Sequence, residues 1–496
     1  MTSESPGNVM SDFRKLVQQS SHYLSGNTLM MLSGFVSFPI LTRIFSVSDY
    51  GTLNLMSSSL VIAIAICKMG LQNSVTRFYE EFKRDNRQAD LYSTIFLSVL
   101  SVSLVFAFLS WMVTQWIKTD VVSGDTLALF SFIAVLIVIR SGYEILSTFL
   151  RAEQRTKLLN AIAVGVRYGS LSLSLIIVFW IMRNLYGFWF GVMLGEGVVA
   201  VALAFVYIRS RKLQCGEFSF PVLRKALQYG VPHFAWDIIG SIFIYADRYL
   251  VQYYLGSEAL GIYSAGYNLS QYMYEFLAHP LNRAILPVAM AAWVQKGEEE
   301  TKEFLSKTLR YYLLIAIPGT FGFIAVSENV VLLMASEKYR EAAELIPYIV
   351  VGGMTFAGCL VFRTTLLIKQ KTGLLACLMV FACILNIVMN VLLIPRCGLV
   401  GAALSTLLSY LSLVALIVFF SLRHLPIRIE TVPILRYVLF GFIMFLVVGE
   451  IEFGSAAGSL GGKVVCGVVI YGALVSIFDR EIREKARGLV NARLGK

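Results

Sequence analysis

Charged side chains are scarce in this sequence. Asp, Glu, Lys and Arg supply 15% of its 496 residues, whereas apolar residues supply 57%. Soluble domains carry about 25% charged residues, so the composition excludes an ordinary soluble domain. The mean hydropathy of +0.71 agrees with this conclusion. Because a bilayer core about 30 Å thick requires roughly 20 apolar residues per helix, we expect many membrane-spanning segments.

The apolar runs also lack the strict alternation of apolar and polar residues that is typical of membrane β-barrels. Lipid offers the backbone no hydrogen-bond partners, so the remaining way for the chain to cross a membrane is as α-helices. We therefore predict an all-α integral membrane protein.

Motifs for catalysis, nucleotide binding and metal binding are missing as well. The run Gly461-Gly462-Lys463 is followed by Val464 and lacks the earlier glycine of a phosphate-binding loop, and no GxSxG or HExxH sequence occurs. None of the seven cysteines has CxxC or metal-ligand spacing. We expect no catalytic residues, no cofactor and no metal site, so the protein is predicted not to be an enzyme.

About fourteen apolar windows of roughly 20 residues follow one another along the chain. They lie near residues 27–45, 52–72, 91–114, 127–149, 158–181, 187–208, 229–252, 260–287, 311–332, 343–367, 373–394, 399–421, 435–450 and 463–478. An even number of spans places both termini on the same side of the membrane.

The loops on the two sides of the membrane differ in charge. About 29 Lys and Arg residues fall on one side and about 6 on the other. The basic side holds loops 77–90, 151–157, 209–227 and 291–310 and the tail 480–496. Cytoplasmic loops are enriched in Lys and Arg, so both termini are predicted to be cytoplasmic. This distribution explains the net charge of +11 without a nucleic-acid partner.

Two loop sequences occur twice in the chain. Residues 41–51 are similar to residues 248–263, and residues 150–156 are similar to residues 366–372. Chance similarity between loops is the alternative interpretation. We favour an internal repeat, because both pairs connect one predicted span to the next.

The repeat predicts two six-helix lobes. The N-terminal lobe covers residues 1–213 and the C-terminal lobe residues 214–430. Six spans per lobe make the lobes parallel, with a pseudo-two-fold axis along the membrane normal. Residues 431–496 add spans thirteen and fourteen and a basic cytoplasmic tail.

Eleven charged residues lie in or near the predicted spans. They are Lys68, Arg140, Glu144, Arg167, Glu196, Asp237, Asp247, Arg248, Glu275, Arg283 and Arg363. A charge at the centre of a lipid-facing helix costs about 2.5–3.5 kcal/mol, so we expect these residues to face the bundle interior, water or each other.

Polar residues three or four positions apart form a stripe on each of two consecutive predicted spans. The first stripe consists of His233, Asp237, Ser241, Tyr245 and Arg248, and the second of Asn268, Tyr272, Glu275, His279 and Arg283. Such stripes are predicted to line a hydrated central cavity. The pairs His233–Asp237 and Glu275–His279 are candidates for proton coupling, since each joins an imidazole and a carboxylate; isolated polar histidines are the alternative.

The arginines have more than one interpretation. Arg140 and Glu144 lie one helical turn apart and form either an ion pair within their helix or a substrate contact. Arg167, Arg283 and Arg363 have no nearby carboxylate in the sequence, which makes them candidates for binding an anion.

Three motifs carry a resemblance to a known family. The first is Pro39-Ile40-Leu41-Thr42-Arg43 with Asp49-Tyr50-Gly51. The second is Asp247-Arg248-Tyr249-Leu250 with Leu255-Gly256 and Leu260-Gly261-Ile262-Tyr263. The third is Asn386-Ile387-Val388-Met389-Asn390-Val391-Leu392-Leu393-Ile394-Pro395 with Gly398 and Gly401-Ala402-Ala403. Over roughly residues 25–425 the chain resembles the polysaccharide transporters, which include O-antigen flippases, of the multidrug/oligosaccharidyl-lipid/polysaccharide exporter superfamily.

The resemblance implies a two-lobed bundle that opens alternately to each side of the cytoplasmic membrane. It implies translocation of undecaprenyl-pyrophosphate-linked oligosaccharide units from the inner to the outer leaflet, for the O-antigen of lipopolysaccharide, capsule or exopolysaccharide. The implied partners are this lipid-linked oligosaccharide, membrane lipids, a polysaccharide polymerase and a chain-length regulator.

A pyrophosphate cargo suits a cationic cavity, because arginine forms paired hydrogen bonds with phosphate. The residues predicted to make that cavity cationic are Arg140, Arg167, Arg248, Arg283 and Arg363. The alternative is a cation-coupled multidrug exporter of the same superfamily, for which acidic residues would dominate the cavity. Cations slightly outnumber acids among the eleven residues above, which favours an anionic cargo.

Overall fold

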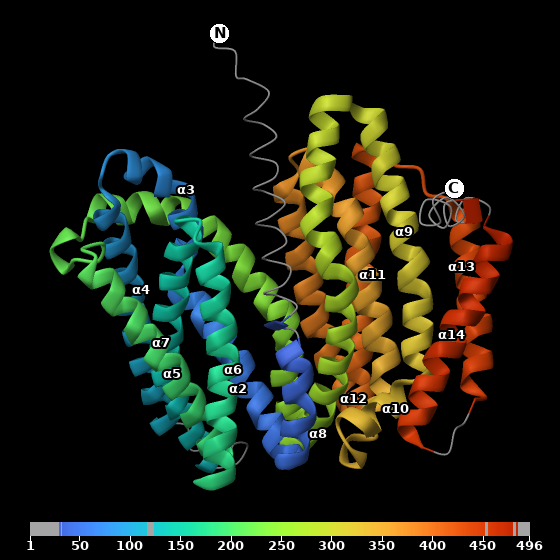
Figure 1. Ribbon diagram of the computed structural model, residues 1–496, viewed down its shortest axis with the longest axis horizontal. Helices are drawn as coiled ribbons and strands as arrows, with labels where there is room; N and C mark the ends of the chain where they lie inside the picture. Colours follow the sequence, from blue (N-terminus) through green and yellow to red (C-terminus); the bar gives the residue numbers. More distant parts are fainter. Residues whose placement is uncertain (1–28, 31, 117–123, 452–454, 480–482, 485–496) are drawn as a thin grey trace, which may run out of the picture. The chain divides into compact units, whose positions relative to one another are not determined.

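The computed structural model describes residues 29–30, 32–116, 124–451, 455–479 and 483–484. A helix over Leu32–Ile44 comes first. It is followed by α2 (Val47–Lys68), α3 (Leu71–Arg84), α4 (Gln88–Trp116), α5 (Gly124–Ala152), α6 (Thr156–Trp180), α7 (Leu185–Arg209), η1 (Cys215–Glu217), α8 (Phe220–Lys296), α9 (Glu298–Ala325), α10 (Ser327–Met334), η2 (Glu337–Tyr339), α11 (Ala342–Ile368), α12 (Thr372–His424), α13 (Thr431–Gly449) and α14 (Ala456–Phe478) (Figure 1). These described residues contain no strand, and the predicted all-α class is confirmed.

Ten of the described helices are long and apolar enough to cross a membrane. One of them, α12, has 53 residues and would extend about 80 Å if straight, more than twice the thickness of a bilayer core. Its backbone breaks at Gly398, where φ is 59°, and the 77-residue α8 breaks at Gly256, where φ is 83°. The ten helices include α12 but not α8. Counting α12 as two spans, and adding the two parts of α8 and the helix Leu32–Ile44, gives the predicted number of fourteen spans, which stays a prediction.

The chain forms two compact units. Unit 1 consists of Met1–Leu41 and Thr52–Ala246, and unit 2 of Thr42–Gly51 and Asp247–Lys496. The boundary between them lies within α8, whereas the lobe boundary predicted from the repeat lies at residues 213–214. The lobes are defined by repeated sequence rather than by packing and stay a prediction.

Aromatic side chains and one carboxylate hold unit 1 together at the end of α5. The rings of Tyr92 and Phe149 stack with centroids 4.1 Å apart inside a core of buried residues from α3, α4, α5 and α7. Glu153, in the repeated loop sequence, accepts hydrogen bonds from Lys212 Nζ at 2.7 Å and Tyr92 Oη at 3.3 Å, and its carboxylate lies 3.1 Å from Arg155 Nε. The contacts of Glu153 in this loop therefore stabilise a helix junction of unit 1.

Glycines in the repeated motifs allow two backbones of unit 2 to touch. A Cβ added at Gly51 would overlap the carbonyl oxygen of Ser257, and one added at Gly261 would overlap that of Val47. Arg43 donates hydrogen bonds to the carbonyl oxygens of Leu333 at 2.6 Å and Met334 at 3.2 Å, at the end of α10. The first two motifs of the family resemblance thus contribute packing contacts to unit 2.

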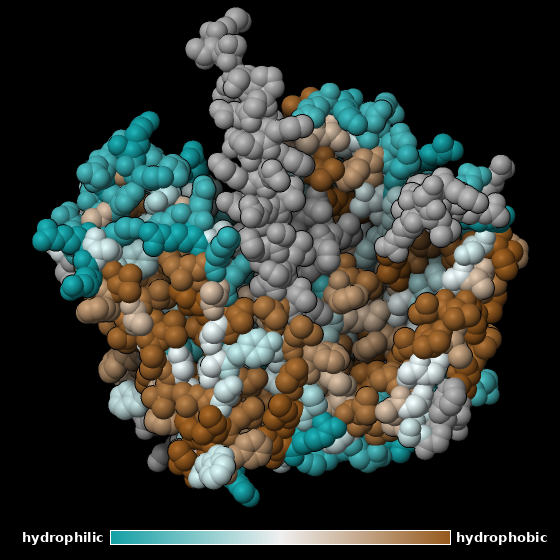
Figure 2. All heavy atoms as spheres, viewed as in Figure 1, coloured by the Kyte–Doolittle hydropathy of each residue, from teal (hydrophilic) through white to brown (hydrophobic). Residues whose placement is uncertain are grey.

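The appended helices present apolar side chains outward. Leu435 and Leu439 of α13 and Val465 and Val468 of α14 are all more than half exposed. Figure 2 shows hydrophobic residues over the sides of these helices and hydrophilic ones gathered near helix ends. Large exposed apolar side chains of this kind are typical of a lipid-facing surface.

Candidate functional site: a charged cavity in unit 1

A cavity of about 530 Å³ lies among α2, α5 and α8 within unit 1. Apolar residues such as Val61 and Trp236 form part of its wall. Its polar lining consists of Lys68, Arg140, Glu144, Asp237, Ser241 and Tyr245. The cavity therefore gathers, in an otherwise apolar protein, charged side chains that would be costly to expose to lipid.

The turn that ends α2 brings two polar side chains to this cavity region. Met69 and Gly70 adopt left-handed φ values of 47° and 75°, so the helix stops at Lys68 and α3 begins at Leu71. A Cβ added at Gly70 would overlap the carbonyl oxygen of Gly230 in α8, so only glycine permits this approach. The approach places Gln72 next to α8, where its Nε2 donates to Asp237 Oδ2 at 3.0 Å.

Two ion pairs join the helices around the cavity. Lys68 Nζ lies 2.5 Å from Glu144 Oε2, and these side chains are 17% and 40% exposed. Arg140 donates to both oxygens of Glu196 on α7, with its Nε 2.7 Å from Oε2. The interpretation of Arg140 and Glu144 as an ion pair within one helix is therefore wrong: each pairs with a residue of another helix.

The cavity is not rich in unpaired cations. Lys68 and Arg140 supply two positive charges, and Glu144, Glu196 and Asp237 supply three negative ones. The carboxylates come from three helices, because α7 provides Glu196 and α8 provides Asp237 in addition to Glu144 of α5. Asp237 has only the neutral Gln72 amide against its carboxylate among the described side chains.

The other predicted cationic residues lie elsewhere. Arg167 is on α6, exposed, and its Nε donates to Ser33 Oγ at 2.8 Å. Arg248 belongs to unit 2, where it is buried. Its Nη1 lies 3.4 Å from Oδ1 of Asp247, and its Cζ lies 4.4 Å from the ring centroid of Tyr267. Arg363 is half-buried on α11. The side chain of Arg283 lies outside the described residues.

The predicted coupling pairs are not joined where the structure describes them. The exposed His233 ring packs on Tyr229, with centroids 4.9 Å apart and Nδ1 3.1 Å from the Tyr229 carbonyl oxygen, while Asp237 binds Gln72. Glu275 Oε1 accepts a hydrogen bond from Gln271 at 3.1 Å. The side chain of His279 lies outside the described residues. Of the four candidates, Asp237 lines the cavity of unit 1.

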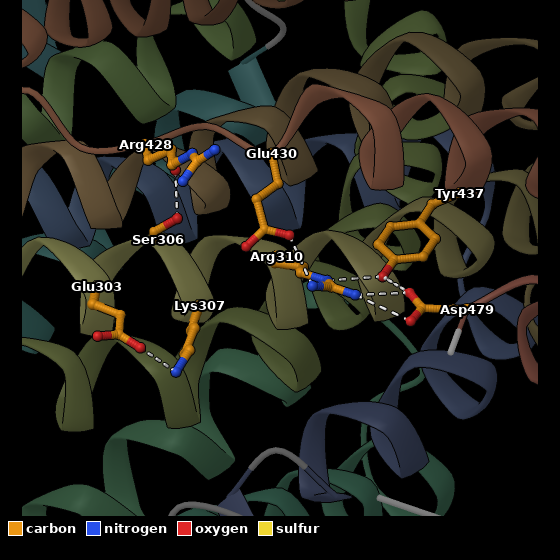
Figure 3. Close-up of polar contacts among 8 residues, drawn as sticks. All are labelled: Glu303, Ser306, Lys307, Arg310, Arg428, Glu430, Tyr437 and Asp479. Carbon is orange, nitrogen blue, oxygen red and sulfur yellow. Dashed lines mark hydrogen bonds and ion pairs between the residues drawn. The ribbon is translucent and has the colours of Figure 1, made fainter. Parts of the chain in front are cut away.

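A second charged network was not anticipated from the sequence. Arg310 on α9 donates to Glu430 at 2.8 Å, to Asp479 at 2.9 Å and to Tyr437 Oη at 3.2 Å (Figure 3). Tyr437 in turn donates to Asp479 at 2.6 Å. The sequence predicts that Arg310 lies in a basic loop, because it follows Lys302 and Lys307, but α9 begins at Glu298 and includes Arg310.

Unit 2 also contains an apolar cavity of about 590 Å³ between α9 and α14. Gly319 and Gly322 of α9 and Gly467 and Gly472 of α14 help to form its walls, and among the described residues that line it Lys463 is the one that carries a charge. With so few polar groups, this cavity does not provide a site for a polar head group. The unit 1 cavity is therefore the better candidate for binding polar cargo.

Comparison with known proteins identifies related sequences over most of the chain. A family described as polysaccharide biosynthesis protein matches residues 40–344. The probable low-salt glycan biosynthesis flippase Agl15 of Haloferax volcanii is 22% identical over 384 residues, which cover 76% of this chain and 77% of that protein. The uncharacterized membrane protein MJ1068 of Methanocaldococcus jannaschii is 21% identical over 490 residues, covering 92% and 96%.

Solved structures show the same fold. The lipid II flippase MurJ in an inward closed conformation superposes with a TM-score of 0.76 and 15% identity, covering 94% of this chain and 99% of that one. An inward-facing multidrug resistance MATE family transporter of the MOP superfamily gives a TM-score of 0.60 and 13% identity, covering 79% and 97%. The chain is therefore a multi-pass membrane protein with the fold of these transporters.

Proposed function

Since the chain belongs to the polysaccharide biosynthesis protein family, we propose that it is a flippase for undecaprenyl-pyrophosphate-linked oligosaccharides. The observation that carries the proposal is the family match over residues 40–344, which includes every residue that lines the charged cavity of unit 1. The relative Agl15 is itself named as a probable glycan biosynthesis flippase.

In the proposed cycle, the protein opens alternately to the two sides of the cytoplasmic membrane and moves the cargo from the inner to the outer leaflet. The sugar and pyrophosphate occupy polar cavities such as the one in unit 1, while the lipid tail stays in the bilayer. Ser241 and Tyr245 supply hydroxyl groups for sugars, and Lys68 supplies a cation for phosphate. Arg167, Arg248, Arg283 and Arg363 are proposed as further phosphate contacts. The product serves the synthesis of O-antigen, capsule or exopolysaccharide.

One observation favours a second candidate, a cation-coupled multidrug exporter. Glu144 and Asp237 line the unit 1 cavity, and Glu196 pairs with Arg140 beside it. The site therefore has three carboxylates and two cations. Such a cavity suits a cationic drug, and the fold is shared with a MATE transporter. The two candidates differ in the charge of the cargo, which an export experiment measures directly.

Deletion of the gene is expected to abolish surface polymer and to leave lipid-linked oligosaccharide in the inner leaflet. Expression of the intact protein should restore the polymer, and proteoliposomes that contain it should move a fluorescent lipid-linked oligosaccharide between leaflets. Efflux of a cationic dye should be the same with and without the protein. If the dye is exported and the oligosaccharide is not moved, the protein is a multidrug exporter instead.

Both termini and the basic loops are proposed to be cytoplasmic, and cysteine labelling is expected to show it. In a variant without its native cysteines, which include the exposed Cys377 and Cys397, a single cysteine at Lys225 should react with an impermeant maleimide only after permeabilisation. A cysteine at Lys338, in η2 on the opposite side of the predicted topology, should react in intact cells. The reverse pattern would invert the topology.

A further inference from the structure

The two cations of the unit 1 cavity differ in how firmly each is held. Arg140 makes two hydrogen bonds to the carboxylate of Glu196, which is 10% exposed, so an anion that displaced Glu196 would have to break both. Lys68 makes a single ion pair with Glu144, and among the described residues Glu144 is its one hydrogen-bonded or ion-paired partner. Lys68 is therefore the cation whose partner is more easily displaced.

The position of this ion pair makes the exchange possible. Glu144 is 40% exposed, the most open of the four ion-paired side chains of the site, and both it and Lys68 line the cavity. A lysine ammonium has three donors, and Glu144 uses one of them. Lys68 is also the last residue of α2, where the negative end of the helix dipole favours a positive charge.

The charge of the cavity explains why an exchange is required. The charges of Lys68 and Arg140 are balanced by those of Glu144 and Glu196. Asp237 adds a negative charge, and among the described side chains its carboxylate is contacted by a neutral amide alone. An anion entering this site is repelled by the carboxylates, and it gains an ion pair only with a cation that one of them releases. Glu144 is the carboxylate able to release its cation, because its side chain is 40% exposed and water can hydrate it afterwards. A free carboxylate binds the Lys68 ammonium no more strongly than Glu144 does, so it does not displace Glu144. A pyrophosphate carries more charge and more acceptor oxygens.

From these contacts we infer that Lys68 is the phosphate-binding residue of the unit 1 cavity and that Glu144 occupies it when no cargo is present. The inference rests on the proposed function for the identity of the cargo, a pyrophosphate-linked lipid. On binding, the ammonium of Lys68 exchanges the carboxylate of Glu144 for a phosphate oxygen. Glu144 thereby selects against anions that bind more weakly than its own carboxylate.

The test uses the full-length purified protein in detergent, with inorganic pyrophosphate as the probe in isothermal titration calorimetry. Glu144→Gln removes the competitor and should bind pyrophosphate about ten-fold more tightly than the original protein, the value of roughly one charge-assisted hydrogen bond. Lys68→Gln should bind about ten-fold more weakly. The double variant Lys68→Gln/Glu144→Gln should show none of the gain, because the gain requires Lys68.

The ion pair between Lys225 and Glu81 provides a matched control. It also belongs to unit 1 and also has an N–O distance of 2.5 Å, but neither residue lines the cavity. Glu81→Gln and Lys225→Gln should change pyrophosphate affinity by less than about two-fold, the size expected for exposed charges. A gain in Glu81→Gln equal to that in Glu144→Gln would show a nonspecific effect of net charge and would overturn the inference.

Two further outcomes would contradict the proposed role of Lys68. If Glu144→Gln binds no more tightly, or if its gain persists in the double variant, Lys68 is not the phosphate-binding residue. Because the decisive result is a gain of binding, misfolding does not imitate it, and Lys68→Arg, which keeps the charge, should retain binding. If pyrophosphate binds as expected but proteoliposomes do not move lipid-linked oligosaccharide, the proposed function fails while the anion site stands.

Discussion

Replacement of Arg310 by alanine is expected to lower the free energy of unfolding by about 3–5 kcal/mol, because it leaves two carboxylates without their cation in a largely buried network. The side chains of Arg310 and Asp479 are 11% and 8% exposed. Glu430 precedes α13, Tyr437 lies within α13 and Asp479 follows α14, so one guanidinium on α9 fixes both appended helices (Figure 3).

The effect should appear as a lower midpoint of thermal unfolding and as faster hydrogen exchange in α13 and α14 than in the helices of unit 1. Arg310→Lys should recover only part of the stability, since an ammonium does not reproduce the planar set of donors. Lys307→Ala is the matched control: it lies one helical turn earlier on α9, and its ion pair with Glu303 has side chains 51% and 58% exposed. We expect it to cost about 0.5 kcal/mol or less.

Equal midpoints for Arg310→Ala and Lys307→Ala would contradict this account of the network. A lower midpoint without faster exchange in α13 and α14 would mean that Arg310 stabilises unit 2 without holding these helices in place.

The fold class was predictable from the sequence because the requirement to satisfy backbone hydrogen bonds in lipid leaves few alternatives. The positions of most spans follow from hydropathy for the same reason. The residue at which one helix ends and the next begins is harder to predict from the sequence, because a single residue determines it. The breaks in α8 and α12 occur at Gly256 and Gly398, and hydropathy does not distinguish them from glycines within a continuous helix, such as Gly401.

The sequence marks the charges of this site as costly, but it does not predict which of them pair. The sequence identified Lys68, Arg140, Glu144, Glu196 and Asp237 as costly charges, and spacing along one helix suggested only the neighbours three or four positions away. The actual partners are 76 positions apart for Lys68 and Glu144 and 56 for Arg140 and Glu196. Such contacts depend on which helices pack together, and the spacing of residues along one helix does not show this.

Replacement of Arg140 by alanine should lower the free energy of unfolding nearly as much as replacement of Arg310 does. Arg140→Ala leaves the carboxylate of Glu196 buried without a cation, and Glu196→Ala leaves the guanidinium, so each is expected to cost about 3–5 kcal/mol. The pair Arg340–Glu328 is the control, because its side chains are 61% and 53% exposed and Arg340→Ala should leave the midpoint of thermal unfolding nearly unchanged. Thermal unfolding of the purified variants measures these differences.

The double variant Arg140→Met/Glu196→Leu separates a structural role of Arg140 from a role in binding cargo. Replacing a buried ion pair by apolar residues of similar size is often neutral for stability, so the double variant should unfold within about 1 kcal/mol of the original protein. The two hydrogen bonds from Arg140 to Glu196 favour the structural role, and we therefore expect the double variant to export polymer at a normal rate at matched membrane levels. A stable double variant that exports no polymer would show instead that Arg140 contacts the cargo, and the phosphate site would then include it beside Lys68.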